Sequence, residues 1–157
     1  MQDRLIKEVF GMLRQRQLML ATAESCTGGL VAACMTSLAG SSAVFERGWV
    51  TYTNQAKETE LGVDRAIFDG SGAVSEACVL AMARGAIQYS NADVSLAVSG
   101  IAGPGGAVPD KPVGTVWLAW GLGQGRFEAQ VFHFEGDRQQ VREQAVEQAL
   151  TGLLRRL

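Results

Sequence analysis

A serine and a lysine each follow a predicted strand, and together they could carry out nucleophilic catalysis. Ser25 comes shortly after the apolar run "LMLATA" at 18–23, and Lys57 lies one turn into a helix predicted after the strand-like "GWVTYT" at 48–53. To accept a proton from Ser25 near neutral pH, Lys57 needs its pKa lowered from about 10.4 by roughly three units. Burial against apolar walls can lower it in this way. The alternative is an ordinary solvated lysine on a short helix.

Other bases, metals and cofactors have weaker support in the sequence. His133 is the only histidine and alternates with two phenylalanines in a predicted strand, as expected of a half-buried strand residue. Lys7 falls on a surface helix, and Lys111 falls in a proline-flanked loop. One histidine and dispersed carboxylates do not form a metal site. "GPGGAV" also fails the dinucleotide fingerprint, so we expect neither a metal nor a cofactor.

The residues after Ser25 allow both a structural and a chemical interpretation. Ser25 or Thr27 could cap a helix, and Cys26 is a rival nucleophile that lacks a histidine partner. Capping does not require Gly28 and Gly29 in the first turn, where each costs about 1 kcal/mol relative to alanine. Glycines there would let a ligand approach free amides at the positive end of the helix dipole. These amides could hold the oxyanion of a tetrahedral intermediate.

Three further side chains could serve the same site. Tyr52, in the strand before Lys57, could relay a proton or fix the lysine, although strand tyrosines usually only pack. Arg138 and Arg142 are one turn apart on the last predicted helix, where they could hold a phosphate. Solvated surface arginines are the alternative for this pair.

The hydrophobic pattern predicts alternating strands and helices followed by a terminal hairpin. The predicted strands cover 18–23, 48–53, 93–100, 113–120 and 125–134. The predicted helices cover 1–17, 30–40, 54–63, 75–90 and 137–157, with caps at Asp3, Ser75 and Asp137. This order favours an α/β fold with a mixed, mostly parallel sheet of about five strands, one of them antiparallel, covered by helices on both faces.

The predicted fold brings three polar or glycine-rich segments to one place. Segments 24–29, 54–57 and 99–106 each follow the carboxyl end of a predicted strand. Ligands of open α/β sheets bind at that edge. If the strands are parallel, the three segments face one pocket.

Composition limits the class of protein. With 157 residues and 47% apolar content, residues 1–157 should form a single domain with one core. The net charge of −2 and the lack of a basic run argue against a nucleic-acid partner. The charged N-terminal segment predicts an amphipathic helix rather than a signal peptide, and no stretch is apolar enough to span a membrane. Three cysteines without close pairing fit reduced thiols in the cytoplasm.

Six segments occur in the order and approximate spacing of a known family. They are "AESCTGG", "TYTNQAK", "GAVSE", "VSGIAGPGG", "KPVGTVWLA" and "GDRQQVR". In these segments the sequence resembles the CinA C-terminal domain family, whose active members are nicotinamide-nucleotide amidohydrolases. The resemblance covers nearly the whole chain.

The resemblance implies a fold, a reaction and roles for residues. It implies a three-layer α/β/α sandwich, association as a homo-oligomer, and a metal-free serine and lysine pair at Ser25 and Lys57 with Tyr52 beside them. The implied reaction converts nicotinamide mononucleotide into nicotinate mononucleotide and ammonia, in pyridine nucleotide (NAD) recycling. Candidates for positioning the ring and ribose are Asn54, Ser99, Gly100, Gly103 and Thr115.

Two other functions stay open on the sequence alone. One is a nucleotide-binding or protein-interaction module that keeps the pocket without turnover. The other is an amidase that acts on a different small amide. Loss of Ser25 or Lys57 would favour the first alternative, and both residues are present.

Overall fold

A five-stranded mixed sheet forms the middle layer of the protein. The computed structural model describes residues 2–157 and orders the strands β2-β1-β3-β4-β5. The strands are β1 (Leu20–Glu24), β2 (Phe45–Val50), β3 (Val94–Gly100), β4 (Thr115–Gly121) and β5 (Phe127–His133). β1 pairs in parallel with β2 and β3, whereas β4 pairs antiparallel with β3 and β5. Four strands therefore run in one direction and β4 runs against them, which confirms the expected mixed sheet.

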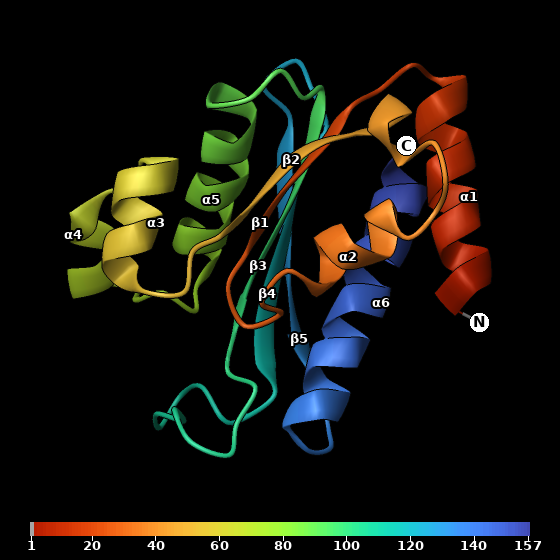
Figure 1. Ribbon diagram of the computed structural model, residues 1–157. Helices are drawn as coiled ribbons and strands as arrows, with labels where there is room; N and C mark the ends of the chain where they lie inside the picture. Colours follow the sequence, from red (N-terminus) through yellow and green to blue (C-terminus); the bar gives the residue numbers. More distant parts are fainter. Residues whose placement is uncertain (1) are drawn as a thin grey trace.

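Helices cover both faces of the sheet (Figure 1). One outer layer contains α1 (Gln2–Gln15), α2 (Leu30–Thr36) and α6 (Arg138–Arg156). The other contains α3 (Asn54–Leu61), α4 (Arg65–Asp69) and α5 (Glu76–Gln88). The predicted three-layer α/β/α sandwich is confirmed. No helix between residues 2 and 157 has the length and apolar character that crossing a membrane requires.

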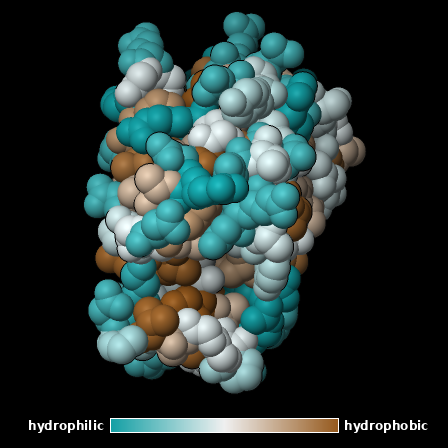
Figure 2. Space-filling model, turned by 90° about the vertical axis from the view of Figure 1, so that its left-hand side faces the viewer, coloured by the Kyte–Doolittle hydropathy of each residue, from teal (hydrophilic) through white to brown (hydrophobic). Residues whose placement is uncertain are grey.

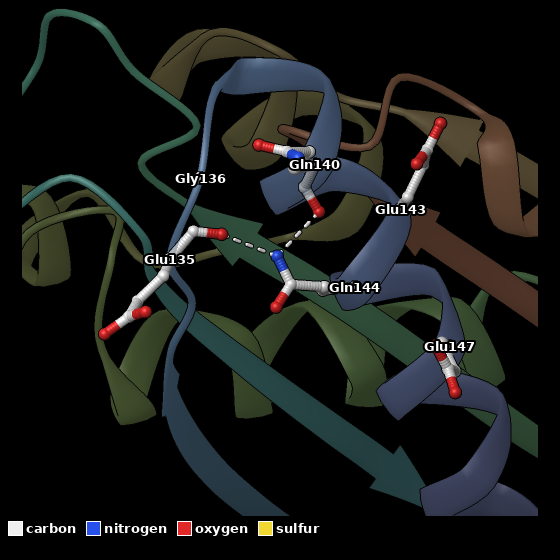
Figure 3. A pocket seen from close by; sticks show the side chains of 6 residues that line it. All are labelled: Glu135, Gly136, Gln140, Glu143, Gln144 and Glu147. Carbon is white, nitrogen blue, oxygen red and sulfur yellow. Dashed lines mark hydrogen bonds between the residues drawn. The ribbon is translucent and has the colours of Figure 1, made fainter.

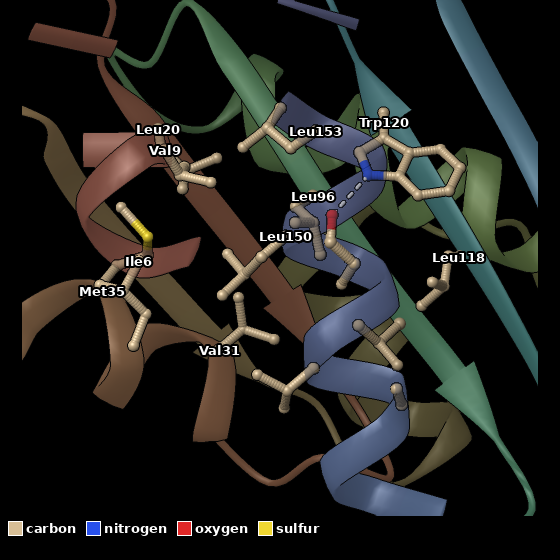
Figure 4. Close-up of a cluster of buried hydrophobic side chains, with 14 of the residues drawn as sticks. Ile6, Val9, Leu20, Val31, Met35, Leu96, Leu118, Trp120, Leu150 and Leu153 are labelled. Atoms are coloured by element: carbon tan, nitrogen blue, oxygen red, sulfur yellow. Dashed lines mark hydrogen bonds between the residues drawn. The ribbon is translucent and has the colours of Figure 1, made fainter. Parts of the chain in front are cut away.

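Large apolar side chains fill the space between the sheet and the layer of α1, α2 and α6 (Figure 4). Trp120 of β4 is fully buried there, and its Nε1 donates a hydrogen bond to the Ala149 carbonyl of α6 at 2.9 Å. The bond satisfies the one polar atom of the indole, so the ring can be buried without leaving a donor unpaired. α6 is thereby fixed to the sheet.

The opposite face of the sheet carries Trp49, Trp117 and Phe127 as well as a group of small side chains. The small side chains are Ala21, Ala23, Ala97 and Ala119 on the strands, with Ala83 and Ala86 facing them from α5. Such residues let α5 lie close to the strands, and α3 in turn packs against α5. At that second contact Gly85 leaves no room for a side chain, because an added Cβ would collide with the Leu61 carbonyl. Gly85 therefore sets how closely α3 approaches α5.

Several predicted boundaries were wrong. β2 begins at Phe45 and ends at Val50, so 51–53 lie outside it. The chain leaves the strand there because Thr53 caps α3 by accepting a hydrogen bond from the Ala56 amide. Asp3 lies inside the first turn of α1 rather than capping it, and α4 was not predicted at all.

The helix expected at 30–40 ends early, at Thr36. Thr36 and Ser37 turn their hydroxyl groups back onto carbonyls of the preceding turn, and this competes with further helix. The chain then passes through a short 3-10 helix, η1 (Ser41–Ala43), before β2.

We expect Gly85→Ala to lower the free energy of unfolding by about 1–3 kcal/mol, because the added methyl forces α3 and α5 apart. Gly11→Ala is the matched control, since nothing lies within 4 Å of its Cβ on α1 and alanine favours a helix by up to about 1 kcal/mol. Urea denaturation of both variants measures the difference. Equal stability of the two variants would contradict the close contact.

Candidate active site

Ser25 and Lys57 meet in a nearly solvent-free position. Lys57 Nζ donates a hydrogen bond to Ser25 Oγ at 3.0 Å and a second one to the Thr51 carbonyl oxygen at 2.7 Å. Lys57 is 1% exposed and Ser25 is 9% exposed. The structure therefore brings the two predicted groups within direct proton-transfer distance.

Burial controls the protonation of Lys57. It lowers the pKa of this lysine, because the ammonium form loses its hydration; the nearby Cys78 and Cys26 thiols act in the opposite direction. Part of the Lys57 population is then neutral at a pH where an exposed lysine is charged. A neutral amine with a free lone pair can accept the serine proton.

The backbone of Lys57 is held by the start of α3. The Thr53 side chain accepts from the Ala56 amide at 3.0 Å, and the Lys57 amide donates to the Thr53 carbonyl at 3.1 Å. The cap fixes the first turn and directs the lysine back toward the end of β2. The sequence predicted this placement one turn into the helix correctly.

A buried carboxylate fixes the segment that carries Ser25. Glu24, the last residue of β1, is fully buried. Its Oε1 accepts from Thr27 Oγ1 at 2.7 Å and from the Val31 amide at 2.8 Å, and its Oε2 accepts from the Ala32 amide at 3.1 Å. Three donors compensate for the lost hydration of the carboxylate. Sequence reasoning missed this residue, although a carboxylate directly after a buried strand was the available signal.

This arrangement corrects the predicted helix start. α2 begins at Leu30, and its N-cap is Gly29, which makes no side-chain cap. Neither Ser25 nor Thr27 is the cap. Instead, the Glu24 carboxylate accepts hydrogen bonds from two amides of the first helical turn. Gly28 and Gly29 have φ values of 59° and 99°, so the turn before the helix requires them whether or not a ligand binds.

The free amides lie in the turn rather than in the helix. Among the amides from Cys26 to Gly29, which the structure describes in full, only that of Gly28 donates within the protein, to the Ser25 carbonyl at 2.9 Å. The Ser25 amide donates to the Val98 carbonyl of β3 at 3.0 Å. The Cys26 and Thr27 amides, which directly follow Ser25, are therefore the nearest available donors for an oxyanion.

A hollow of about 240 Å³ opens beside the pair. Nine predicted residues line it: Ser25, Cys26, Tyr52, Asn54, Lys57, Ser99, Gly100, Gly103 and Arg138. Six others complete it: Ala73, Val74, Ile101, Ala102, Gly105 and Gly106. Figure 2 views the face formed by α3, α4 and α5, where apolar atoms show in a hollowed band below the centre. The carboxyl ends of β1, β2 and β3 meet at this pocket, as the topology predicted.

The pocket carries positive charge. Arg138 donates through Nη1 to the Gly103 carbonyl at 2.8 Å and through Nη2 to Tyr52 Oη at 2.7 Å. Tyr52 is 55% exposed, at the rim. Of the described residues that line the hollow, Arg138 bears a permanent positive charge and none bears a carboxylate, while burial favours the neutral form of Lys57. This balance favours an anionic ligand.

Cys26 is a poor nucleophile in this setting. Burial raises the pKa of the Cys26 thiol to about 11, so the thiol stays protonated near neutral pH. Burial raises the pKa of Cys78 to about 11 as well. The geometry and the protonation state both favour Ser25 over its neighbour.

Some predicted site residues lie outside the pocket lining. Thr27, Gly28 and Gly29 form the turn behind Ser25. Thr115 is buried, and its hydroxyl donates to the Pro112 carbonyl at 2.7 Å, so it holds the loop after β3 in shape. His133, which was expected to be a half-buried strand residue and not a site residue, is instead exposed at the end of β5.

Arg142 also lies outside the lining, although it was predicted to hold a phosphate beside Arg138. Its Nε donates to the Cys26 carbonyl at 3.0 Å, and its Nη2 lies 3.4 Å from the Thr27 carbonyl. The two arginines of α6 therefore contact different parts of the site. Arg138 reaches the pocket and Arg142 reaches the back of the turn.

A second hollow lies along the start of α6 (Figure 3). Its lining is Glu135, Gly136, Gln140, Glu143, Gln144 and Glu147. Gln144 Nε2 donates to the Glu135 carbonyl at 2.8 Å and to the Gln140 carbonyl at 2.9 Å, and so closes the helix start. Three glutamates there would repel an anion. Within residues 2–157, histidine, cysteine, aspartate and glutamate side chains nowhere gather in threes that could hold a metal ion.

The fold and the site define a class: an α/β/α sandwich with a buried serine–lysine pair at the carboxyl edge of its sheet. The family model for the CinA C-terminal domain matches residues 2–157. The chain belongs to the CinA C-terminal domain family.

Relatives occur both as short proteins and as parts of longer ones. The chain is 53% identical over 142 residues to nicotinamide-nucleotide amidohydrolase PncC of Pseudomonas putida, covering 90% of this chain and 88% of that protein. It is 48% identical over 149 residues to the Escherichia coli K12 protein of the same name, covering 95% and 90%. A CinA-like protein of Akkermansia muciniphila is 52% identical over 150 residues, covering 96% of this chain, which spans 36% of that relative.

Solved structures share the fold closely. A CinA superfamily protein from Escherichia coli superposes with a TM-score of 0.96 at 39% identity, covering all of this chain and 91% of that one. The competence/damage inducible protein CihA from Agrobacterium tumefaciens gives 0.96 at 42% identity, covering 99% and 94%.

We expect Glu24→Gln to lower the free energy of unfolding by about 1–3 kcal/mol. The glutamine amide nitrogen is itself a donor. It would face one of the N–H or O–H groups whose hydrogen bond the carboxylate now accepts. Glu8→Gln is the matched control, because Glu8 pairs with Arg4 on the exposed face of α1 and such pairs contribute about 0–1 kcal/mol. Equal losses in chemical denaturation would show that Glu24 does not hold the turn.

Proposed function

We propose that the protein hydrolyses the carboxamide of nicotinamide mononucleotide to nicotinate mononucleotide and ammonia. The observation that carries the proposal is the buried 3.0 Å contact between Lys57 Nζ and Ser25 Oγ, in a pocket that is lined by the Arg138 guanidinium and by no carboxylate. The names of the two PncC relatives supply the substrate. The pocket charge fits a substrate that bears a phosphate.

In the first half of the reaction Lys57 acts as the base. Its neutral amine takes the Ser25 hydroxyl proton while Oγ forms a bond to the carboxamide carbon. The carbonyl oxygen becomes an oxyanion, which the Cys26 and Thr27 amides stabilise. No metal takes part in these steps.

The second half returns the enzyme to its starting state. The oxyanion re-forms the carbonyl as the carbon–nitrogen bond breaks, and ammonia leaves with the proton that Lys57 took from Ser25, delivered directly or through the Tyr52 hydroxyl. Water then attacks the acyl ester and gives up a proton to Lys57. The ester bond breaks, the acid departs, and Ser25 recovers its proton.

Residues around the pair would position the substrate. Arg138 lies at the pocket rim, where its guanidinium could meet the phosphate. Asn54, Ser99, Gly100 and Gly103 would face the ring and ribose. In this proposal the enzyme works in the cytoplasm as a homo-oligomer, in the recycling of pyridine nucleotides.

Ammonia release from nicotinamide mononucleotide tests the proposal. We expect Ser25→Ala and Lys57→Ala each to lower kcat by about 10³-fold or more, since each variant removes one half of the catalytic pair. Ser42→Ala and Lys7→Ala, at exposed positions, are the matched controls and should keep full activity. A folded wild type that releases no ammonia would reject the activity. Full turnover in either pair variant would reject the mechanism.

A further inference from the structure

Arg142 holds the back of the turn that carries Ser25. It projects from α6 and bonds the Cys26 and Thr27 carbonyls, at 3.0 Å and 3.4 Å. The side chain is half-buried and does not line the pocket. Within residues 2–157, no carboxylate forms an ion pair with it. Its charge is therefore directed at backbone carbonyls alone.

The covalent order of the backbone connects those carbonyls to the free amides. The Cys26 carbonyl belongs to the same peptide group as the Thr27 amide. The Thr27 carbonyl shares a peptide group with the Gly28 amide, which donates to the Ser25 carbonyl at 2.9 Å. The Ser25 carbonyl in turn shares its peptide group with the Cys26 amide. The Thr27 amide is thus linked to the guanidinium directly, through its own peptide group, and the Cys26 amide is linked through one further hydrogen bond.

A cation bound to a carbonyl makes the amide of that peptide group a stronger donor. Chains of hydrogen bonds polarise one another, by about 10–30% per bond. The same contacts restrict rotation of the turn, so the Cys26 and Thr27 amides keep one orientation. The charge of Arg142 also reaches the pocket side of the turn, because it lowers the pKa of the Cys26 thiol against the larger rise caused by burial.

We propose that Arg142 is a positioning residue for the oxyanion hole. It orients and polarises the Cys26 and Thr27 amides and does not bind the phosphate of the substrate. The proposal rests on the proposed function for its substrate and for Ser25 and Lys57 as the reacting pair. Arg138, one helical turn away, keeps the phosphate role.

Two substrates that differ only in the phosphate distinguish these roles. For Arg142→Gln we expect kcat to fall by about tenfold or more with KM changed by less than about twofold. The value of kcat/KM should fall by the same factor for nicotinamide mononucleotide and for nicotinamide riboside. Arg142→Lys keeps the charge and should recover part of the loss. Arg155→Gln, at an exposed position of the same helix, should leave both substrates unaffected.

A rise in KM for the mononucleotide alone, with kcat unchanged, would overturn the proposal and assign Arg142 to the phosphate. Arg138→Gln should instead raise KM for the mononucleotide alone. Circular dichroism establishes that each variant is folded. If Arg142→Gln does not fold, the kcat and KM of Arg142→Lys for the two substrates decide between the two roles in the same way.

A substrate-independent measurement separates this inference from the proposed function. A fluorophosphonate labels a nucleophilic serine: Ser25 Oγ bonds to phosphorus, fluoride leaves, and the serine proton passes to Lys57. The negative charge that builds on the phosphoryl oxygen would face the same amides. Intact-mass kinetics should show labelling of Arg142→Gln slowed by about tenfold, and equal rates would overturn the inference. Slowed labelling without ammonia release from the wild type would reject the substrate while supporting the role of Arg142.

Discussion

The proposed chemistry depends on one constraint: the Lys57 amine is buried and has lost its hydration. Lys57 is almost fully buried, yet among residues 2–157 its Nζ hydrogen-bonds only to a hydroxyl and a backbone carbonyl, not to a carboxylate. A carboxylate partner would favour the ammonium, whereas these neutral partners let burial lower the pKa. In the proposed mechanism this lowered pKa makes the buried amine available as the base for Ser25.

The rest of the fold holds Ser25 and Lys57 next to each other. β1, β2 and β3 are parallel, so Ser25 and the segment leading to Lys57 emerge at the same edge. Glu24 and Arg142 hold the turn after Ser25 from two sides, and the close packing of α5 against α3 supports the lysine. Small side chains facing α5 and large ones on the other face of the sheet allow both helical layers to approach the sheet.

The sequence predicted the elements with strong periodicity and the pairing of Ser25 with Lys57. Buried strands and amphipathic helices leave local patterns, and two strand ends are enough to place the pair at one edge. The sequence could not show that Glu24 caps α2, because the carboxylate reaches forward over a turn rather than along a helix. It also could not separate Arg142 from Arg138, since only the packing of α6 decides which arginine faces the pocket.

The pKa of Lys57 tests the central claim most directly. The chain has three lysines, so lysine labelled with carbon-13 at Cε gives a simple spectrum, and the signal lost in Lys57→Met identifies residue 57. We predict that this signal titrates with a midpoint below the ordinary lysine value of about 10.4. A midpoint at or above that value would mean that the buried amine stays charged, and would contradict its role as the base for Ser25.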